Sequence, residues 1–188
     1  RKCGLCISRD LYCEFAVTEF KHDKTFTKLL AEISRLNPAE ILIPETLELE
    51  QIPGSFLTKI PNWKFELGRC NQLLCSQFSV NSLEGFGLKN HDSAISAAGV
   101  ALDYIIEKEP SSLKIFDQVH FYSLDEFMVL DEATRRNLEL TETMRNSSEK
   151  GSLLQIIDKT ITPMGKRLIK QWINQPLINR HEIIARLD

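Results

Sequence analysis

The segment that most constrains the fold is HDSAISAAGVALDYIIEKE, residues 91–109, which has the length and pattern of a helix. Between Ala94 and Ile106 its only charged residue is Asp103, and alanine and glycine fill its first half. A helix that is apolar nearly all round is buried on most sides, and its small residues allow neighbouring elements to approach closely. The segment therefore predicts a buried helix packed closely against a sheet.

The residues before this helix supply candidates for that sheet. Residues 5–9 and 12–20 are rich in aromatic and branched side chains on either side of the polar SRD, and they predict a hairpin. Residues 23–36 have helical spacing and stop at Asn-Pro. Residues 39–44, AEILIP, and 63–67, WKFEL, predict two short strands separated by a proline-containing loop. A hairpin, a helix and further strands favour a mixed α/β sheet over a helical bundle.

The pattern changes towards the end of the chain. Residues 113–130 alternate and predict edge or crossover strands, whereas short helices are expected from there onwards. Three of these helices are marked by capping residues: Asp131, Thr162 followed by Pro163, and Asn179. A short apolar run near residues 152–159 marks another. We therefore expect an α/β domain over residues 1–130 and an all-α segment over residues 131–188, with the boundary near residues 125–130.

Charge and hydropathy exclude some functional classes. The chain has 23 basic and 26 acidic residues and a net charge of -3, which argues against a strongly basic nucleic-acid surface. No apolar run reaches the roughly 18 residues of a membrane span, and no leader pattern is present. We therefore expect a cytoplasmic protein without a membrane partner. Because the first residue is Arg1 rather than methionine, we also expect a fragment of a longer protein.

The cysteines raise the question of a redox or zinc site. Cys3 and Cys6 form CGLC, and Cys13, Cys70 and Cys75 follow. A redox pair opens a helix, whereas this segment alternates like a two-stranded ribbon. A zinc site usually has a second close pair, and Cys70 and Cys75 are too widely spaced for one. Structural cysteines are the expected interpretation, with zinc or redox chemistry as the alternative.

Other chemical motifs are missing from the sequence. It contains no phosphate-binding loop, dinucleotide fingerprint or nucleophile elbow, and Gly85 and Gly87 in EGFGLKN are too few for a phosphate cradle. The histidines lack ligand spacing: His22, His91, His120 and His181. We therefore predict no catalytic, cofactor-binding or metal-binding residue.

One enzymatic alternative remains open, a ribonuclease-H-like nuclease that places carboxylates around two metal ions. Its candidates are Asp10, Glu40 and Asp103. Asp10 falls in the expected turn beside Arg9, a cation that would repel a metal. Asp103 is expected to face solvent or to bond a backbone group. A fold of this kind does not by itself imply nuclease activity.

Several blocks of the sequence resemble one protein family. Residues 131–144, DEATRRNLELTETM, followed by residues 162–177, TPMGKRLIKQWINQPL, resemble the junction of connector and core in the MutS DNA mismatch repair proteins, closest to the bacterial branch. NPAEILIPE, FSVNSLEGFGL and AAGVALDYI resemble the connector in the same order. Together these blocks cover most of the chain and are specific in combination.

The resemblance implies a ribonuclease-H-like connector domain without nuclease activity over residues 1–130, followed by a truncated first part of the helical core and lever domain. The mismatch-reading, clamp and nucleotide-binding domains would lie outside the chain. No cofactor is then expected here, whereas the parent protein would be a homodimeric, DNA-dependent ATPase that uses ATP and magnesium on mismatched DNA.

The resemblance also implies a role in relaying conformational change and in docking MutL, the next protein in the pathway. The helix after WKFEL carries Asn71, Gln72 and Gln77, which match the part of the connector implicated in MutL binding, although such residues can also be simply solvated. Asp131, Arg135 and Arg136 are expected to anchor one domain on the other through guanidinium contacts with carboxylates or carbonyl ends. The alternative is a solvated helix face.

Overall fold

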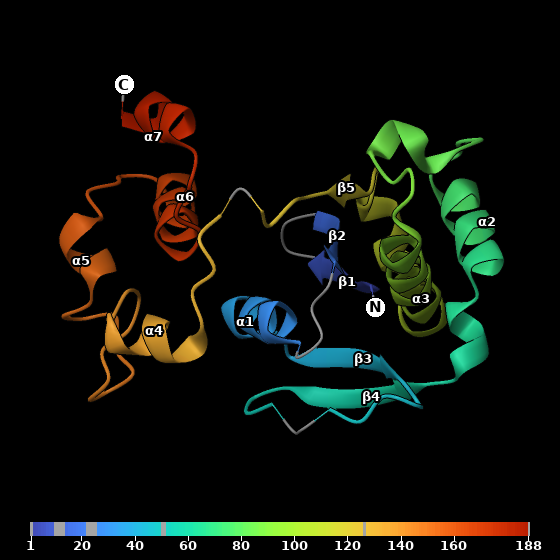
Figure 1. Cartoon of the computed structure of the whole chain (residues 1–188), viewed down its shortest axis with the longest axis horizontal. Helices are drawn as coiled ribbons and strands as arrows, with labels where there is room; N and C mark the ends of the chain where they lie inside the picture. Colours follow the sequence, from blue (N-terminus) through green and yellow to red (C-terminus); the bar gives the residue numbers. More distant parts are fainter. Residues whose placement is uncertain (1, 10–13, 22–25, 50–51, 126, 188) are drawn as a thin grey trace. The chain divides into compact units, whose positions relative to one another are not determined.

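The computed structural model describes residues 2–9, 14–21, 26–49, 52–125 and 127–187. The chain divides into two compact units (Figure 1). Unit 1 comprises Arg1–Leu29 and Asn37–Ser123, and unit 2 comprises Leu30–Leu36 and Leu124–Asp188. The helix α1 (Thr27–Leu36) therefore contributes residues to both units.

The strands of unit 1 belong to two small sheets. β1 (Lys2–Arg9) and β2 (Glu14–Lys21) pair antiparallel, which confirms the predicted hairpin, and β5 (His120–Phe121) pairs parallel to β2. β3 (Glu40–Pro44), predicted from AEILIP, pairs parallel to β4 (Phe56–Ile60). The fold is thus mixed α/β, as expected.

The strand predicted for WKFEL is wrong. Asn62–Phe65 form a 3₁₀ helix, η2, and Leu67–Gln77 form α2, whereas the strand of this region is β4, in the segment interpreted as a loop. The aromatic residues favour a strand locally, but Pro61 starts a turn whose carbonyl accepts a 3.0 Å hydrogen bond from the Lys64 amide. That turn ends the parallel pairing before Trp63 is reached.

The prediction of edge or crossover strands over residues 113–130 is mostly wrong. Unit 1 continues with η3 (Leu83–Phe86), α3 (Asp92–Lys108) and the 3₁₀ helix η4 (Pro110–Ile115). Leu113 therefore lies in η4 and not in a strand. Pro110 begins this 3₁₀ helix, because the fixed φ of proline suits the first helical position. Among the described residues of the segment 113–130, the extended structure consists of β5 and an isolated antiparallel bridge between Phe127 and Leu177.

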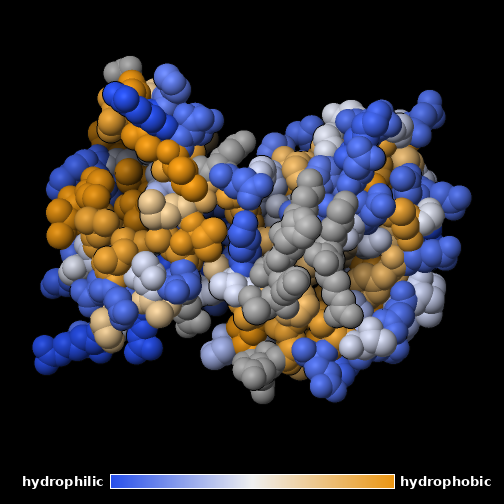
Figure 2. Space-filling view, in the orientation of Figure 1, coloured by the Kyte–Doolittle hydropathy of each residue, from blue (hydrophilic) through white to orange (hydrophobic). Residues whose placement is uncertain are grey.

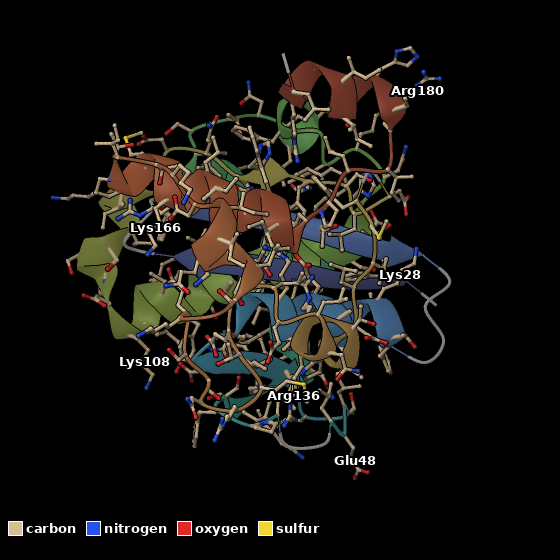
Figure 3. All side chains as sticks on the ribbon, turned by 90° about the vertical axis from the view of Figure 1, so that its left-hand side faces the viewer. Lys28, Glu48, Lys108, Arg136, Lys166 and Arg180 are labelled. Atoms are coloured by element: carbon tan, nitrogen blue, oxygen red, sulfur yellow. The ribbon has the colours of Figure 1, made fainter. Side chains whose placement is uncertain are left out.

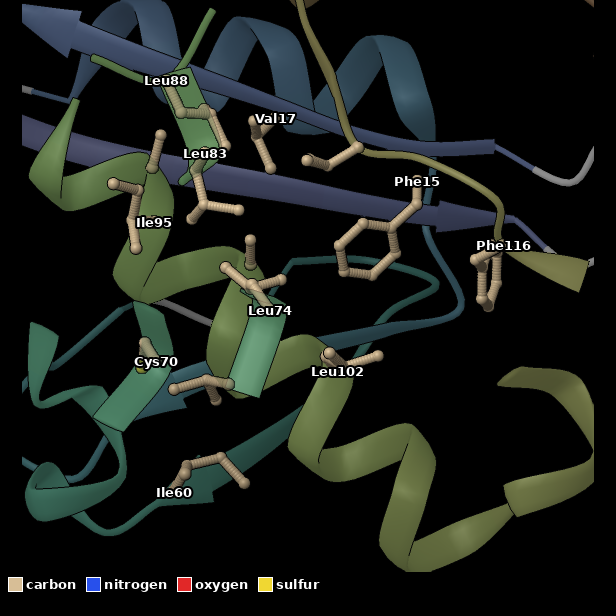
Figure 4. Close-up of a cluster of buried hydrophobic side chains, with 14 residues drawn as sticks. Phe15, Val17, Ile60, Cys70, Leu74, Leu83, Leu88, Ile95, Leu102 and Phe116 are labelled. Atoms are coloured by element: carbon tan, nitrogen blue, oxygen red, sulfur yellow. The ribbon is translucent and has the colours of Figure 1, made fainter. Parts of the chain in front are cut away.

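The helix α3 is buried, as its sequence predicts. Within unit 1 it lies between the β1–β2 hairpin and α2 (Figure 1), and its buried residues join the main hydrophobic cluster, which also includes Phe15, Leu74 and Leu83 (Figure 4). Added Cβ atoms show how closely the layers approach. At Gly4 in β1 such an atom would collide with the Ser93 backbone of α3, and at Gly99 in α3 it would collide with Cys70 of α2.

Unit 2 is helical, and three of its capping residues, Asp131, Thr162 and Asn179, are those that the sequence predicts. α4 (Glu132–Asn137) is capped by Asp131, which accepts a 2.6 Å hydrogen bond from the Thr134 amide. α6 (Pro163–Asn174) is capped by Thr162 and α7 (Arg180–Leu187) follows Asn179, whose side chains accept from the Gly165 and His181 amides at 3.0 and 2.9 Å. Ser152 caps α5 (Leu153–Ile157).

Unit 2 has a hydrophobic surface (Figure 2). Ile161 is 99% exposed and Met164 77% exposed. Other large apolar side chains of α5, α6 and α7 are exposed as well: Leu153, Ile156, Ile157, Leu168, Ile183, Ile184 and Leu187. None of the helices in the described ranges has both the length and the apolar character needed to cross a membrane.

Candidate docking face on α2

The helix α2 has one buried and one exposed side. Cys70 and Leu74 are fully buried against the core of unit 1. Gly68, Gln72 and Ser76 recur at four-residue spacing and are exposed. Residues four apart share one face of a helix. We call the exposed side, together with two apolar neighbours at its N-terminal end, the α2 face: Trp63, Leu67, Gly68, Gln72 and Ser76.

The three polar residues predicted to contact MutL have different surroundings. Gln72 is exposed on the α2 face. Asn71 is half-buried, and its Oδ1 accepts a 3.3 Å hydrogen bond from the Cys75 thiol. Gln77 is also half-buried and donates through Nε2 to the Leu113 carbonyl at 3.2 Å, so it ties α2 to η4. Gln72 is therefore the best placed of the three for contact with another molecule.

Trp63 is the functional candidate that the sequence analysis missed. Its side chain is 61% exposed, and two cations lie against the indole ring. Arg69 Cζ is 5.2 Å and Lys64 Nζ is 5.8 Å from the ring centroid. Both distances are within the range of cation–π attraction. Trp63 was not predicted as a site residue because WKFEL was interpreted as a short strand, and Pro61 was the signal against that interpretation.

The cations beside Trp63 are held by carboxylates of α3. Asp103 Oδ1 accepts a 2.7 Å hydrogen bond from Arg69 Nη2, and its Oδ2 lies 3.0 Å from Lys64 Nζ. Lys64 Nζ also contacts Glu107 Oε1. The expectation that Asp103 faces solvent or bonds a backbone group is wrong, because the residue is buried and its partners are side-chain cations.

The pKa of Asp103 reflects these two influences. Burial acts to raise the pKa of this carboxyl, but the hydrogen bonds and charges of Arg69 and Lys64 outweigh it and hold the pKa below its ordinary value. The hydrogen bond with Glu107, followed by that with Asp103, raises the pKa of Lys64, and the hydrogen bond with Asp103 raises the pKa of Arg69. All these groups are therefore charged near neutral pH, and two cations face two carboxylates.

The five residues of the α2 face are uncharged, and the partly exposed Arg69, three residues before Gln72 on the helix, is the cation beside them. The sequence has no charged residue between Arg69 and Glu84, and Glu66 adds one carboxylate at the start of α2. The centres of protein–protein interfaces are depleted of charged residues and enriched in tryptophan and arginine. A nucleic-acid surface requires cations that can reach phosphates. The composition of the α2 face thus resembles the centre of a protein–protein interface more than a nucleic-acid surface.

Two of the carboxylates considered for metal binding, Glu40 and Asp103, bind other side chains of the domain. Glu40 Oε1 accepts hydrogen bonds from Tyr104, at 2.7 Å, and from Thr58. Asp103 pairs with two cations, and Asp10 lies outside the described residues. Over the part of the chain that the structure describes, no group of three or more His, Cys, Asp or Glu side chains could hold a metal ion. No described cluster supports the nuclease alternative.

The described cysteines have structural surroundings. Cys6, Cys70 and Cys75 are free thiols, the Cys3 thiol donates to the Gly4 carbonyl at 3.8 Å, and Cys13 lies outside the described residues. Burial raises the pKa of Cys6, and it raises the pKa of Cys70 to about 11. Cys70 Sγ donates to the Lys64 carbonyl at 3.2 Å. A buried thiol that stays protonated is a poor nucleophile and a poor metal ligand.

Arg135 of α4 links the end of α6 to Leu130 within unit 2. Its Nε donates to the Leu130 carbonyl at 3.0 Å, and its Nη1 and Nη2 donate to the side chain and the carbonyl of Asn174 at 2.9 and 3.0 Å. Asn174 is the last residue of α6. Burial and the charge of Arg35 lower the pKa of Arg135.

The expected anchoring residues thus differ in their contacts. Arg135 binds carbonyl ends, as its guanidinium was expected to do, but the groups that it binds belong to its own unit. Arg136 is exposed (Figure 3), and Asp131 caps α4. Anchoring of one domain on the other by these three residues stays a prediction.

Comparison with known proteins identifies the family. Residues 3–117 match the family model for MutS domain II, and residues 133–188 match that for MutS domain III. The chain belongs to the MutS family. The first match lies in unit 1 except for Leu30–Leu36, which belong to unit 2, and the second match lies in unit 2.

Individual relatives agree with this assignment. The DNA mismatch repair protein MutS of Halothermothrix orenii is 41% identical over 181 residues, which cover 93% of this chain and 20% of the relative. MutS of Ruminiclostridium cellulolyticum is 38% identical over 183 residues, 93% of this chain and 21% of the relative. The chain therefore spans about a fifth of the length of these MutS proteins.

Proposed function

We propose that the chain is a non-catalytic connector module of a MutS DNA mismatch repair protein, with the first part of the helical core attached. The observation that carries the proposal is the match to MutS domains II and III in sequence order, over residues 3–117 and 133–188. The engagement of Glu40 and Asp103 by hydroxyl groups and cations further supports a module without metal-dependent nuclease activity.

We assign a ribonuclease-H-like fold to the connector. An antiparallel hairpin followed by a helix, further strands and a helix packed on the hairpin is compatible with that fold. In the parent protein the module would relay movement driven by ATP, magnesium and mismatched DNA, and the parent would act as a cytoplasmic homodimer.

We further propose that the α2 face docks MutL, with Gln72 at its centre. Gln72 is exposed, uncharged and flanked along the helix by the small residues Gly68 and Ser76, so a partner backbone can approach it closely. A glutamine side chain offers both a donor and an acceptor to such a partner. Asn71 and Gln77 support the face through their contacts with Cys75 and Leu113.

The test replaces Gln72 with arginine and measures MutL binding. A charged side chain in the centre of an interface should weaken binding roughly tenfold or more. The melting temperature should be nearly unchanged, since exposed substitutions usually alter stability by less than about 0.5 kcal/mol. Gln118→Arg, at an exposed position outside α2, is the matched control. Equal MutL affinity for both variants and the unmodified chain would remove the α2 face from the proposed function.

A further inference from the structure

We propose that Trp63 anchors the docked partner, inserting its indole into an uncharged apolar pocket on a folded protein. This inference rests on the proposed docking function of the α2 face and names the residue that determines its affinity. Tryptophan is among the residues that contribute most to protein–protein binding energy when it enters a well-packed pocket.

The position of Trp63 fits this role. Within unit 1, α2 lies on the side of α3 away from the hairpin (Figure 1), and η2 leads directly into α2. Trp63 is 61% exposed and its ring lies against Arg69 of α2, and Leu67, in the first turn of α2, is 38% exposed. An apolar pair at one end and the amide of Gln72 farther along give the face a hydrophobic anchor and a polar contact.

The surroundings of Trp63 hold the ring in place before binding. Arg69 and Lys64 lie against the ring, and each cation is fixed by an ion pair with Asp103, which is buried in α3. An interface side chain that is already ordered loses less conformational entropy on binding, a loss of about 0.5 to 1.5 kcal/mol for an unrestrained side chain. Asp103 is therefore a positioning residue for the anchor, although it does not belong to the α2 face.

The charges define the class of partner. The cluster of Lys64, Arg69, Asp103 and Glu107 contains two cations and two carboxylates, so it presents no net charge beside the ring. An exposed tryptophan can also stack on nucleic-acid bases, but such sites combine it with cations that track the phosphates. Here the cations already pair with carboxylates. The geometry points to a neutral, apolar protein pocket.

The first experiment compares Trp63→Ala and Trp63→Phe with Phe56→Ala, using purified MutL and the 188-residue chain. Phe56 is 70% exposed at the start of β4, outside the α2 face, and serves as the matched control. Trp63→Ala should weaken MutL binding by roughly 30-fold, the factor expected of an anchor residue. Trp63→Phe should weaken it less, and Phe56→Ala should leave it unchanged.

Fluorescence gives a second readout that does not depend on substitution of the anchor. The chain has two tryptophans, so Trp172→Phe leaves Trp63 as the sole indole. On addition of tryptophan-free MutL, Trp63 emission should shift to shorter wavelength and become protected from iodide quenching. The affinity should vary less than about threefold between roughly 0.05 and 0.5 M salt, because no net charge is neutralised.

The outcomes separate this inference from the function on which it rests. If MutL does not bind the unmodified chain, the docking function fails and the anchor fails with it. If MutL binds and Gln72→Arg abolishes binding, but Trp63→Ala has the affinity of the Phe56→Ala control, the docking function stands and the anchor is wrong. Binding of single-stranded DNA that shifts Trp63 emission and weakens steeply with salt would overturn the protein pocket in favour of nucleic acid.

Discussion

Asp103 of α3 and Arg69 of α2 form a 2.7 Å ion pair that joins the two long helices of unit 1. Lys64 of η2 completes the contact on the other carboxylate oxygen at 3.0 Å. The carboxylate is almost fully buried. One acidic residue therefore connects η2, α2 and α3 and holds the two cations that lie against the ring of Trp63.

Asp103→Asn should lower the free energy of unfolding of unit 1 by about 3 kcal/mol, because it leaves the cations Arg69 and Lys64 beside a neutral group. Asp117→Asn, at an exposed position outside the cluster, is the control and should change it by less than about 0.5 kcal/mol. Urea unfolding followed by circular dichroism measures both. Equal stabilities of the two variants would show that the ion pair does not stabilise the domain.

The same residue predicts the response to acid. The pKa of Asp103 is lower in the folded chain than its ordinary value, so the unfolded chain binds a proton first as the pH falls. The stabilisation is therefore complete above the ordinary carboxyl pKa, near 4, and is lost as the pH falls through the folded value. Melting temperatures measured from about pH 7 to pH 3 should decline less steeply for Asp103→Asn than for the unmodified chain.

Gly99→Ala should be strongly destabilising, by about 2 to 3 kcal/mol or more. An added Cβ would lie 2.6 Å from Cys70 Sγ and 2.7 Å from Cys70 Cα, so α2 and α3 would have to separate. Gly85→Ala is the matched control, since no atom lies within 4 Å of its added Cβ. Thermal denaturation of the two variants tests this, and similar melting temperatures would mean that the helix crossing tolerates a larger separation.

Arg135→Lys should destabilise unit 2 by about 2 kcal/mol, because an ammonium group cannot reproduce three hydrogen bonds in a planar arrangement. Arg136→Lys, at the neighbouring exposed position, should have little effect. Amide hydrogen exchange in α6 gives the local readout, and exchange should accelerate there in the first variant alone. Unchanged protection in α6 would show that Asn174 is held by other contacts.

A chain that ends at Leu130 should unfold cooperatively and be more monomeric than the full 188-residue chain. The reason is the removal of the exposed apolar side chains of α5, α6 and α7, since contiguous apolar patches promote association. Light scattering after size exclusion, combined with thermal melts, measures both properties. In the full chain, Ile161→Ser with Met164→Ser should reduce association in the same way. A non-cooperative melt of the shorter chain would show that the tail belongs to the core of unit 1.

The sequence predicted features that depend on short-range chemistry. The caps Asp131, Thr162 and Asn179 were predictable because a side chain oxygen bonds an amide only two or three residues away. The burial of α3 was predictable because almost no polar residue interrupts its apolar surface. Gln72 was found only through resemblance to a family, since an exposed amide has no distinctive pattern.

Long-range contacts account for what the sequence did not predict. Trp63 and Phe65 favour a strand by their own propensity, but no strand in the described ranges pairs with them, and the turn at Pro61 leads into α2 instead. Asp103 was expected near solvent or a backbone group because its partners, Lys64 and Arg69, lie more than thirty positions earlier in the chain. No local pattern connects residues at such separations.

The division of α1 has a consequence for how this region can be exchanged between relatives. Leu30–Leu36 are part of unit 2, whose other helices begin nearly a hundred positions later in the sequence. The charge of Arg35 lowers the pKa of Arg135, and the charge of Glu32 raises it. A single crossover in the interval between the two family matches would combine α1 of one parent with α4 of the other. Hybrids of distant homologues should therefore regain the stability of the parents only when Leu30–Leu36 and the helices from α4 onwards come from the same parent.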